Sequence, residues 1–318
     1  MNPLNSYIEA FYKNLEKMSV IRPFDPWRSP LCTCPPKYSL SPYTGCGHRC
    51  KYCYITSYIR QPFSPRPKKD FIRRLIRDLR RIDYEKYVSM SNSSDPYTPP
   101  EMKLGLTRKT LEMLIKYNVR VLIVTKSTLV ARDIDILRRG NVSVSITITS
   151  LDNKLASKLE PHAPLPNERL KVLGSLIESG VPCSVRIDPI IPCINDNLSE
   201  LRRLIKMLAG IGVKHIVSST YKARPDSFKR VINTFPDISK KLRELYFEEG
   251  EVIQRYRYLP RNVRYNILKG IAEIVTEEGM SFAVCREGFK ELNTGATCDG
   301  SHLIPKREIR QCQVKLIN

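Results

Sequence analysis

The sequence feature that most constrains this chain's fold is a repeated alternation of short apolar segments with longer segments of helical period. The segments between the apolar runs predict helices at Lys69–Arg81, Thr107–Tyr117, Ala131–Arg139, Asn167–Ser179 and Leu198–Ala209. Strands separated by helices of this length form parallel βαβ units. Six such units could form a partial α/β barrel or a doubly wound sheet. The apolar runs predict strands at Tyr38–Tyr43, Tyr87–Ser91, Val119–Thr125, Val142–Thr149, Cys183–Ile190 and His215–Ser219.

Other patterns flank the alternation. An apolar stripe predicts a helix over Asn5–Met18, ahead of a Pro-rich, Cys-bearing segment. After Lys222 the pattern predicts three helices and one strand. We therefore divide the chain into an N-terminal helix and Cys-bearing segment (1–36), a barrel (37–222) and a helical, cysteine-bearing C-terminal extension (223–318). The elements predicted in the extension are helices at Ser227–Phe235, Leu242–Tyr256 and Arg264–Glu278, and a strand at Ser281–Cys285.

The composition is strongly basic. The chain has 53 Lys and Arg against 32 Asp and Glu, a formal charge of +21. Such an excess is typical of proteins with a nucleic-acid partner, although a solvated basic surface is the alternative. The basic residues gather in three patches, which are Arg60, Arg66, Lys68, Lys69, Arg73, Arg74, Arg77, Arg80 and Arg81; Lys222, Arg224, Lys229 and Arg230; and Arg255, Arg257, Arg261 and Arg264.

The length of the apolar segments indicates whether the chain could span a membrane. The strongest of them, around Val121–Val124, has the length of a strand. The N-terminal residues lack the basic start and apolar middle of a signal peptide. We therefore expect a soluble, cytoplasmic protein with no membrane partner.

Ten cysteines are many for a cytosolic protein, and five of them fall between Cys32 and Cys53. Cys46, Cys50 and Cys53 lie at spacings of four and three in a loop with two glycines. Three thiolates on a four-iron cluster would leave one iron open. Zinc with Cys32 or Cys34 as fourth ligand, an electron-transfer cluster that recruits Cys34, and reduced structural thiols are the alternatives. His48 could also be a fourth ligand, but we expect it to face solvent or cap the turn.

Polar residues follow the predicted strands. The cysteine loop follows the first strand, Asp95 the second, Lys126 the third, Thr149 the fourth and Asp188 the fifth. The carboxyl ends of parallel strands are where α/β enzymes carry their chemistry. The sequence therefore predicts one site at this end of the sheet.

The segment Cys46-x-x-x-Cys50-x-x-Cys53, with Tyr52 before the last cysteine, resembles the signature loop of radical S-adenosylmethionine (SAM) enzymes. The resemblance covers roughly residues 38–221. It implies a partial (β/α)6 TIM-like barrel and a [4Fe-4S] cluster whose open iron binds SAM. It further implies reductive cleavage to a 5′-deoxyadenosyl radical, with the electron coming from a protein such as ferredoxin or flavodoxin.

Further segments resemble the spore photoproduct lyase-like branch, also labelled DNA repair photolyase. By this resemblance Ser93, Lys126 and Thr147 or Thr149 would contact SAM, and Tyr52 and Tyr54 would flank its adenine. Asp95 and Arg186 lie in matching segments and complete the predicted cofactor-binding set. The matching segments are Pro42-Tyr43-Thr44-Gly45-Cys46, Asp95-Pro96-Tyr97-Thr98-Pro99-Pro100-Glu101, Thr125-Lys126-Ser127 with Arg132-Asp133, Glu160-Pro161-His162-Ala163-Pro164, and Arg186-Ile187-Asp188-Pro189-Ile190-Ile191-Pro192.

The sequence departs from that branch at Asn92. The lyases of this branch carry a hydrogen-donating cysteine three residues before the aspartate that Asp95 matches. An amide cannot donate hydrogen in this way, so repair of thymine photodimers by the same route is not expected. Cys183, Cys193 and Tyr97 are the alternative hydrogen donors, although a buried cysteine usually acts as a small hydrophobe.

Four other cysteines could form a second metal site. Cys32 and Cys34 precede the barrel, and Cys285 and Cys298 lie in the extension with glycines nearby. Together they could hold an auxiliary iron–sulfur cluster or zinc and tie the N-terminal segment to the tail. Unrelated reduced thiols, or a disulfide within the tail, are the alternatives.

These features predict a radical SAM enzyme that abstracts hydrogen from a nucleic acid, either a DNA lesion or an RNA base. A radical SAM enzyme acting on a small metabolite or a protein is one rival. A non-catalytic iron–sulfur or zinc protein that binds nucleic acid is the other. Cleavage of SAM to 5′-deoxyadenosine would exclude the non-catalytic protein. Salt-sensitive binding of nucleic acid would argue against an enzyme that acts on a small metabolite or a protein.

Overall fold

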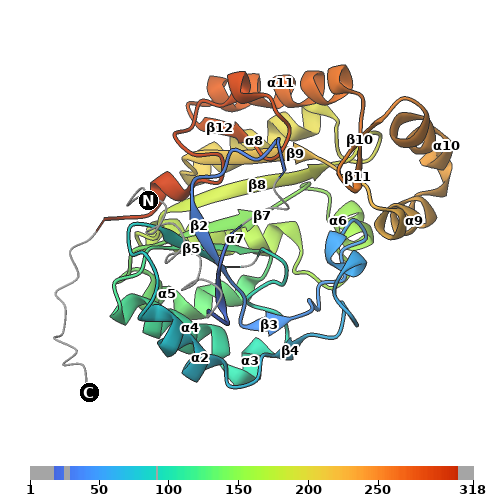
Figure 1. The fold of residues 1–318 in the computed structure, drawn as a ribbon. Coiled ribbons are helices and arrows are strands. Elements are labelled where there is room, and N and C mark those ends of the chain that lie inside the picture. Colours follow the sequence, from blue (N-terminus) through green and yellow to red (C-terminus); the bar gives the residue numbers. More distant parts are fainter. Residues whose placement is uncertain (1–17, 25–28, 91, 307–318) are drawn as a thin grey trace, which may run out of the picture.

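The computed structural model describes residues 18–24, 29–90 and 92–306, and its centre is an eight-stranded sheet (Figure 1). Its order is β1-β2-β5-β6-β7-β8-β9-β12. Neighbours from β2 onward pair in parallel, and β1 pairs antiparallel with β2. The strands are β1 (Ile21–Pro23), β2 (Lys37–Leu40), β5 (Tyr87–Met90), β6 (Val121–Thr125), β7 (Val142–Thr147), β8 (Cys183–Ile190), β9 (His215–Thr220) and β12 (Ser281–Val284).

From β2 onward the parallel strands lie in the sheet in the same order as in the sequence, so the strand order never reverses. A doubly wound sheet would reverse its order at a switch point, whereas a barrel does not. Within the described residues no pairing joins the edge strands β1 and β12, so the barrel is partial. This confirms the predicted α/β partial barrel.

Helices cover the outer face of this sheet (Figure 1). α8 shows why the sequence folds this way: the Asn197 side chain caps it by accepting the amides of Ser199 and Glu200, and Gly212 ends it with a φ of 98°. The helices are α2 (Phe71–Leu79), α3 (Glu101–Leu104), α4 (Leu106–Lys116), α5 (Ile134–Leu137), α6 (Asn153–Leu159), α7 (Pro166–Glu178), α8 (Leu198–Ile211), α9 (Pro225–Thr234), α10 (Ser239–Arg243) and α11 (Arg261–Glu277).

The inner face of the sheet is polar. Along β7, Val142, Val144 and Ile146 join the apolar core, while Ser143 and Ser145 alternate with them and point the other way. Barrel interiors are commonly filled by large branched apolar side chains. Small hydroxyl side chains on the inner face are instead suited to contact a polar ligand.

Most predicted elements are confirmed, with shifted ends. The first strand ends at Leu40, and a separate two-residue strand, β3 (Tyr43–Thr44), pairs with β4 (Arg66–Pro67). The helix predicted over Ala131–Arg139 is a 3₁₀ turn at Thr128–Asp133 followed by α5. Ser91, the end of the second predicted strand, and nearly all of the predicted helix Asn5–Met18 lie outside the described residues.

The prediction of a helix over Leu242–Tyr256 is wrong. A π-helical turn at Glu244–Glu248 leads into an antiparallel hairpin of β10 (Glu251–Ile253) and β11 (Tyr256–Tyr258). Gly250 explains the change, because a Cβ atom there would lie 2.5 Å from the carbonyl oxygen of Tyr258. Only glycine allows the hairpin backbone to approach so closely.

The C-terminal extension is not only helical, because it also supplies the last strand of the sheet. β12 pairs in parallel with β9, with Ser281 opposite His215 and Val284 opposite Ser218. The domain boundaries proposed at residues 36 and 222 remain predictions.

The segment 294–303, which we call the tail, runs past the amino ends of four strands. Asp299 lies 2.6 Å from Lys37 at the start of β2 and accepts a hydrogen bond from Tyr87 at the start of β5. His302 packs edge-on against His215 at the start of β9, with ring centroids 4.8 Å apart. A Cβ atom at Gly300 would lie 2.9 Å from the hydroxyl of Ser184 in β8. The tail therefore spans the open side of the sheet.

None of the described helices is both long enough and apolar enough to cross a lipid bilayer.

Candidate active site

The loop that carries Cys46, Cys50 and Cys53 follows β3 and depends on two glycines. Gly45 has a φ of 83°, and a Cβ atom there would lie 2.9 Å from the carbonyl oxygen of Ser64. At Gly47 a Cβ atom would lie 2.6 Å from the Cδ atom of Pro99. The glycines therefore allow the loop to pack against two other segments.

Hydrogen bonds from distant segments fix the loop backbone. The Cys46 amide donates to the Pro62 carbonyl at 2.7 Å, and the Lys51 amide donates to the Leu159 carbonyl at 2.8 Å. The Arg230 guanidinium donates to the Cys53 carbonyl at 2.8 Å. These hydrogen bonds from other segments of the protein therefore fix the conformation of the loop that carries the three cysteines.

His48 lies in this loop and is buried, so the expectation that it faces solvent is wrong. Its Nε2 atom is 3.1 Å from Asp95 Oδ2, and its Nδ1 atom is 3.3 Å from the His162 carbonyl oxygen. Both ring nitrogens therefore have protein partners. This arrangement makes His48 an anchor of the loop and removes it as a metal ligand.

Asp95 joins the loop to the carboxyl ends of two strands. Its Oδ1 atom accepts from Thr125 at 2.7 Å and from the Tyr97 amide, and its Oδ2 atom accepts from the Lys126 amide at 2.8 Å. Burial acts to raise the pKa of Asp95, but His48 and these hydrogen bonds outweigh it and the pKa is lowered. Asp95 therefore stays ionised, and both its oxygens contact protein groups.

Lys126 belongs to a buried charged network. Its Nζ atom is 3.9 Å from Glu160 and 5.6 Å from the centre of the Tyr52 ring. Arg169 lies 2.5 Å from Glu160, and the Tyr52 hydroxyl donates to the same carboxylate. Burial acts to raise the pKa of Glu160, but Arg169 and Lys126 outweigh it and the pKa is lowered. Two cations against one carboxylate leave this network net positive.

The sequence reasoning assigned no role to Glu160 or Arg169. Glu160 lay in a segment that resembled the lyase-like branch, which was the available signal. Arg169 gave no signal because it lies inside a predicted amphipathic helix, where an arginine normally faces solvent.

The predicted hydroxyl ligands lie at the strand ends. Thr147 and Thr149 are buried at the end of β7, and Ser93 is half-buried after β5. In the described part of the chain, the buried Thr149 hydroxyl lacks a hydrogen-bond partner, and so do the hydroxyls of Ser143 and Ser145 on the same inner face. Unpartnered buried hydroxyls are suited to receive a polar ligand.

Arg186 and Lys222 belong to two further ion pairs on the inner side of the sheet. Arg186 lies 2.6 Å from Asp188, and Lys222 lies 2.8 Å from Glu287. Arg264 lies 3.1 Å from Glu287 and is 1% exposed. The prediction that Arg264 belongs to a surface basic patch is therefore wrong, because it neutralises a buried carboxylate.

Tyr54 is 37% exposed, and its hydroxyl donates to the Asn92 carbonyl. The Asn92 amide group donates to Ser39 at 2.9 Å and to the Ser89 carbonyl, so this side chain ties the ends of β2 and β5 together.

The alternative hydrogen donors lie elsewhere. Cys183 and Tyr97 are in the apolar core, and Cys193 is exposed.

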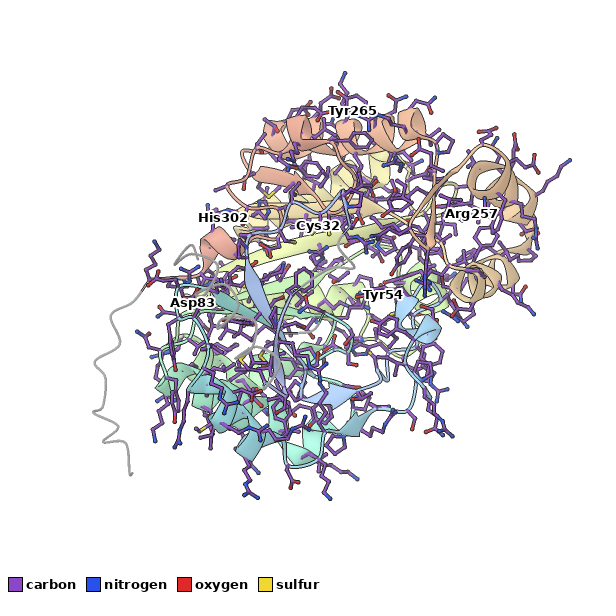
Figure 2. The ribbon with its side chains drawn as sticks, in the orientation of Figure 1. Cys32, Tyr54, Asp83, Arg257, Tyr265 and His302 are labelled. Atoms are coloured by element: carbon purple, nitrogen blue, oxygen red, sulfur yellow. The ribbon has the colours of Figure 1, made fainter. Side chains whose placement is uncertain are left out.

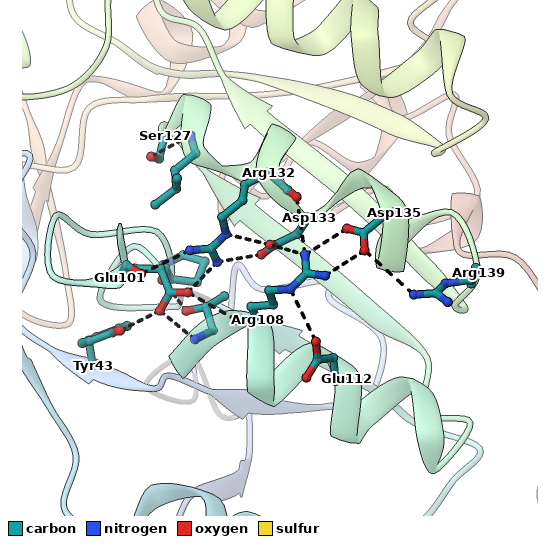
Figure 3. A network of polar contacts seen from close by, with 12 residues as sticks. Tyr43, Glu101, Arg108, Glu112, Ser127, Arg132, Asp133, Asp135 and Arg139 are labelled. Carbon is teal, nitrogen blue, oxygen red and sulfur yellow. Dashed lines mark hydrogen bonds and ion pairs between the residues drawn. The ribbon is translucent and has the colours of Figure 1, made fainter. Parts of the chain in front are cut away.

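A second polar network joins β3, the strand before the cysteine loop, to α3, α4 and the turn at Thr128–Asp133 (Figure 3). Tyr43, in the strand before the loop, donates to Glu101 at 2.6 Å, and Arg132 pairs with the same carboxylate at 2.7 Å. Asp133 bridges Arg132 to Arg108. Arg132 and Asp133, which lie in a segment that resembles the lyase-like branch, therefore hold neighbouring elements together through ion pairs.

The three thiols of the cysteine loop are the part of this site that could hold a metal centre. Within the residues that the structure describes, no three His, Cys, Asp or Glu side chains are grouped around a single-ion position. A four-iron cluster takes thiolates at separate corners, which a wider loop can supply. The fold and the cysteine loop thus define a partial-barrel α/β protein of the iron–sulfur enzyme class.

Comparison with known proteins gives the family. The Radical SAM superfamily domain matches residues 40–208, and the chain belongs to this superfamily. Membership implies a [4Fe-4S] cluster and SAM. The uncharacterised protein ORF301 of Acidianus two-tailed virus is 31% identical over 228 residues, which cover 65% of this chain and 75% of that protein. The Radical SAM Nalpha-GlyT isomerase of Pseudomonas phage M6 is 23% identical, over 77% of this chain and 53% of that protein.

Solved structures share the fold. Spore photoproduct lyase complexed with dinucleoside spore photoproduct matches with a TM-score of 0.60 at 15% identity, over 78% of this chain and 75% of that one. Streptococcus suis SuiB bound to the precursor peptide SuiA matches with a TM-score of 0.53 at 14% identity, over 89% and 54%. The chain is thus a radical SAM enzyme with a spore photoproduct lyase-like fold.

Proposed function

We propose that this radical SAM enzyme acts on a nucleic acid and that Cys46, Cys50 and Cys53 hold its cluster. When bound, the cluster and SAM supply a 5′-deoxyadenosyl radical that abstracts hydrogen from the substrate. The protein's part is to hold the cofactors, orient the substrate and exclude water.

The buried charged network supplies a place for the carboxylate of SAM. Lys126 and Arg169 share one carboxylate, Glu160, so the network retains a net positive charge beside the cysteine loop. The unpartnered hydroxyl of Thr149, together with Ser93 and Thr147, is suited to the hydroxyls and ring nitrogens of the nucleoside. Asp95 acts through His48 and Lys126, and we assign it a positioning role.

Two exposed tyrosines, and two half-buried arginines that stack on the buried Tyr256 ring, carry the nucleic-acid proposal. We call Tyr54, Tyr58, Arg224, Tyr256 and Arg286 the Tyr–Arg surface. Tyr54 and Tyr58 are 37% and 43% exposed, with ring centroids 6.1 Å apart, directly after the last loop cysteine. Figure 2 shows Tyr54 on the side of the molecule that also carries the hairpin residue Arg257. Exposed rings of this kind stack on unpaired bases.

The arginines of the Tyr–Arg surface supply a place for phosphate. The guanidinium groups of Arg224 and Arg286 lie 4.8 and 4.9 Å from the centre of the Tyr256 ring. The Nε atoms of both, and Nη2 of Arg286, are buried and lack hydrogen-bond partners in the described structure. A phosphate oxygen would satisfy them, because guanidinium binds phosphate in a forked geometry.

The alternative substrate is a peptide. SuiB is similar in fold and its structure holds a precursor peptide, whereas spore photoproduct lyase holds a dinucleoside. Arginine nitrogens without hydrogen-bond partners near exposed tyrosines, in a chain with a formal charge of +21, favour the nucleic acid.

Binding of labelled single-stranded DNA and RNA under anaerobic conditions tests this proposal. The unmodified protein should bind with an affinity that falls as salt rises. A double variant, Arg224→Gln with Arg286→Gln, should bind at least ~10-fold more weakly, and its salt slope should fall by about 0.7 for each lost phosphate contact. Arg203→Gln is the matched control, because Arg203 is 70% exposed on the outer helix α8.

Two results would contradict the proposal. One is binding that is insensitive to salt, and the other is equal binding by the double variant and the control. A further measurement follows 5′-deoxyadenosine formation with and without oligonucleotide. If the substrate is a nucleic acid, the oligonucleotide should increase 5′-deoxyadenosine formation. If the substrate is a peptide, the oligonucleotide should leave 5′-deoxyadenosine formation unchanged.

A further inference from the structure

Four cysteines outside the active-site loop meet across the open side of the partial barrel. Cys32 and Cys34 precede β2, near one edge of the sheet, and Cys285 directly follows β12, the other edge. Cys298 lies in the tail that spans the two edges. Figure 2 shows Cys32 on the loop that leads into β2. Segments more than 250 residues apart in the sequence thus bring thiols together.

Three of these thiols are in contact with one another, and Cys285 lies near them. The Cys298 thiol lies 3.5 Å from the Cys34 sulfur, and the Cys32 thiol contacts Cys34 as well. Cys285 is close enough to both Cys32 and Cys298 to act on them electrostatically. Cys298 is buried, the other three are half-buried, and all four are free thiols in the structure.

The 3.5 Å separation is close to that of two ligands of one metal atom. Thiolates about 2.3 Å from a tetrahedral metal lie about 3.8 Å from one another. In the described structure no third donor completes a single-ion site, so binding has to draw Cys32 and Cys285 inward. Cys32 precedes β2 and Cys285 follows β12, so neither lies within a strand, and rotation of their side chains is the movement that binding needs.

Two cations lie beside this group. The Nζ atom of Lys37 is 3.3 Å from the Cys34 sulfur, and its side chain is 4% exposed. The Arg186 guanidinium contacts Cys285. Four thiolates around zinc, or around an oxidised four-iron cluster, carry a net charge of about −2. Lys37 and Arg186 also pair with Asp299 and Asp188, so they offset only part of such a charge.

We propose that Cys32, Cys34, Cys285 and Cys298 bind a second metal centre through four thiolates, separate from the active-site loop, and that this centre joins the two edges of the open sheet. Zinc and an iron–sulfur cluster share this ligand chemistry, and the experiment distinguishes them. A Cys34–Cys298 disulfide is the competing arrangement.

The test uses the full chain with Cys46, Cys50 and Cys53 changed to Ala, so that only the second centre can hold metal. One sample is loaded anaerobically with iron and sulfide and another with zinc alone, and metal per chain is measured after gel filtration. We expect about one zinc, or about two to four irons with the absorption of a cluster. Adding Cys34→Ser and Cys298→Ser should remove this metal, whereas adding Cys183→Ser and Cys193→Ser should not.

A second measurement covers the case in which the Cys34 and Cys298 variants fail to fold. In the metal-loaded triple variant, thiol alkylation followed by mass spectrometry should show the four cysteines protected and Cys193 modified, and a chelator should expose them. Absence of bound metal in both loadings, or a Cys34–Cys298 disulfide in protein purified anaerobically, would overturn the proposal. Neither result bears on nucleic-acid binding, which is measured separately.

Discussion

The Nε2 atom of His48 lies 3.1 Å from the Oδ2 atom of Asp95, and this contact joins the cysteine loop to the strand ends. The same carboxylate oxygen accepts the amide of Lys126. One buried side chain therefore sets the position of both the cluster loop and the lysine that we assign to SAM.

This relationship predicts that Asp95→Asn loosens the loop. The amide replaces one acceptor oxygen by a donor, so one of the contacts to His48, Lys126 or Thr125 is lost at a cost of about 1–3 kcal/mol. We expect iron to leave the reconstituted variant several-fold faster in the presence of a chelator. Asp237→Asn, whose side chain is exposed in the C-terminal extension, is the control. Equal rates for the two variants would refute the role of Asp95.

The cysteine loop predicts that Cys50→Ala abolishes SAM cleavage. Cys50 is the central ligand of the triplet and is 7% exposed, so no solvent ligand replaces it readily. Production of 5′-deoxyadenosine by the anaerobically reconstituted, reduced variant should fall to background. Cys183→Ala, in the apolar core, controls for loss of a buried thiol. Full turnover by the Cys50 variant would overturn the cluster assignment.

Lys126→Ala should weaken SAM binding while the fold persists. Loss of one charge-assisted contact costs about 1.5–3 kcal/mol, which corresponds to a roughly 10- to 100-fold rise in Kd. Glu160 keeps its partner Arg169 at 2.5 Å, so the remaining carboxylate is not left alone. Equilibrium dialysis of SAM measures the effect, and Lys103→Ala on the surface is the control. Unchanged affinity for SAM in the Lys126 variant would exclude the lysine from the cofactor site.

His215 predicts a pH dependence of stability. Burial and the neighbouring His302 lower the pKa of His215 to about 4, from an ordinary value of 6.5. The unfolded chain binds this proton more readily than the folded chain does. The contribution of neutral His215 to the free energy of unfolding is therefore complete above pH ~6.5 and is lost as the pH falls toward ~4. The loss amounts to about 3 kcal/mol.

His215→Gln removes this dependence. Between pH 7.5 and 4.5 the unmodified protein should lose about 2–3 kcal/mol of unfolding free energy more than the variant does, as measured by urea denaturation. The control is His162→Gln, whose side chain is exposed. Parallel losses in the unmodified protein and the His215 variant would contradict the prediction.

The parallel strands could be predicted because one face of each packs in the apolar core and because they alternate with segments of helical period. The cysteine loop was likewise visible as local spacing. The hairpin after Gly250 was not, since its reason is a backbone approach to Tyr258, a residue of another strand. The roles of Arg169 and Arg264 were hidden for a related reason. A buried arginine and an exposed one have the same sequence signature until their carboxylates, Glu160 and Glu287, are placed beside them.

The tail has a consequence for how the protein is made. Lys37 and Tyr87 are among the first barrel residues to be synthesised, yet their common partner, Asp299, is among the last of the described residues. Until the ribosome releases that segment, a buried lysine at the start of β2 has no counter-ion. The nascent chain therefore carries an unfinished sheet until the segment around Asp299 has been synthesised, and the amino ends of the strands are covered only after that point.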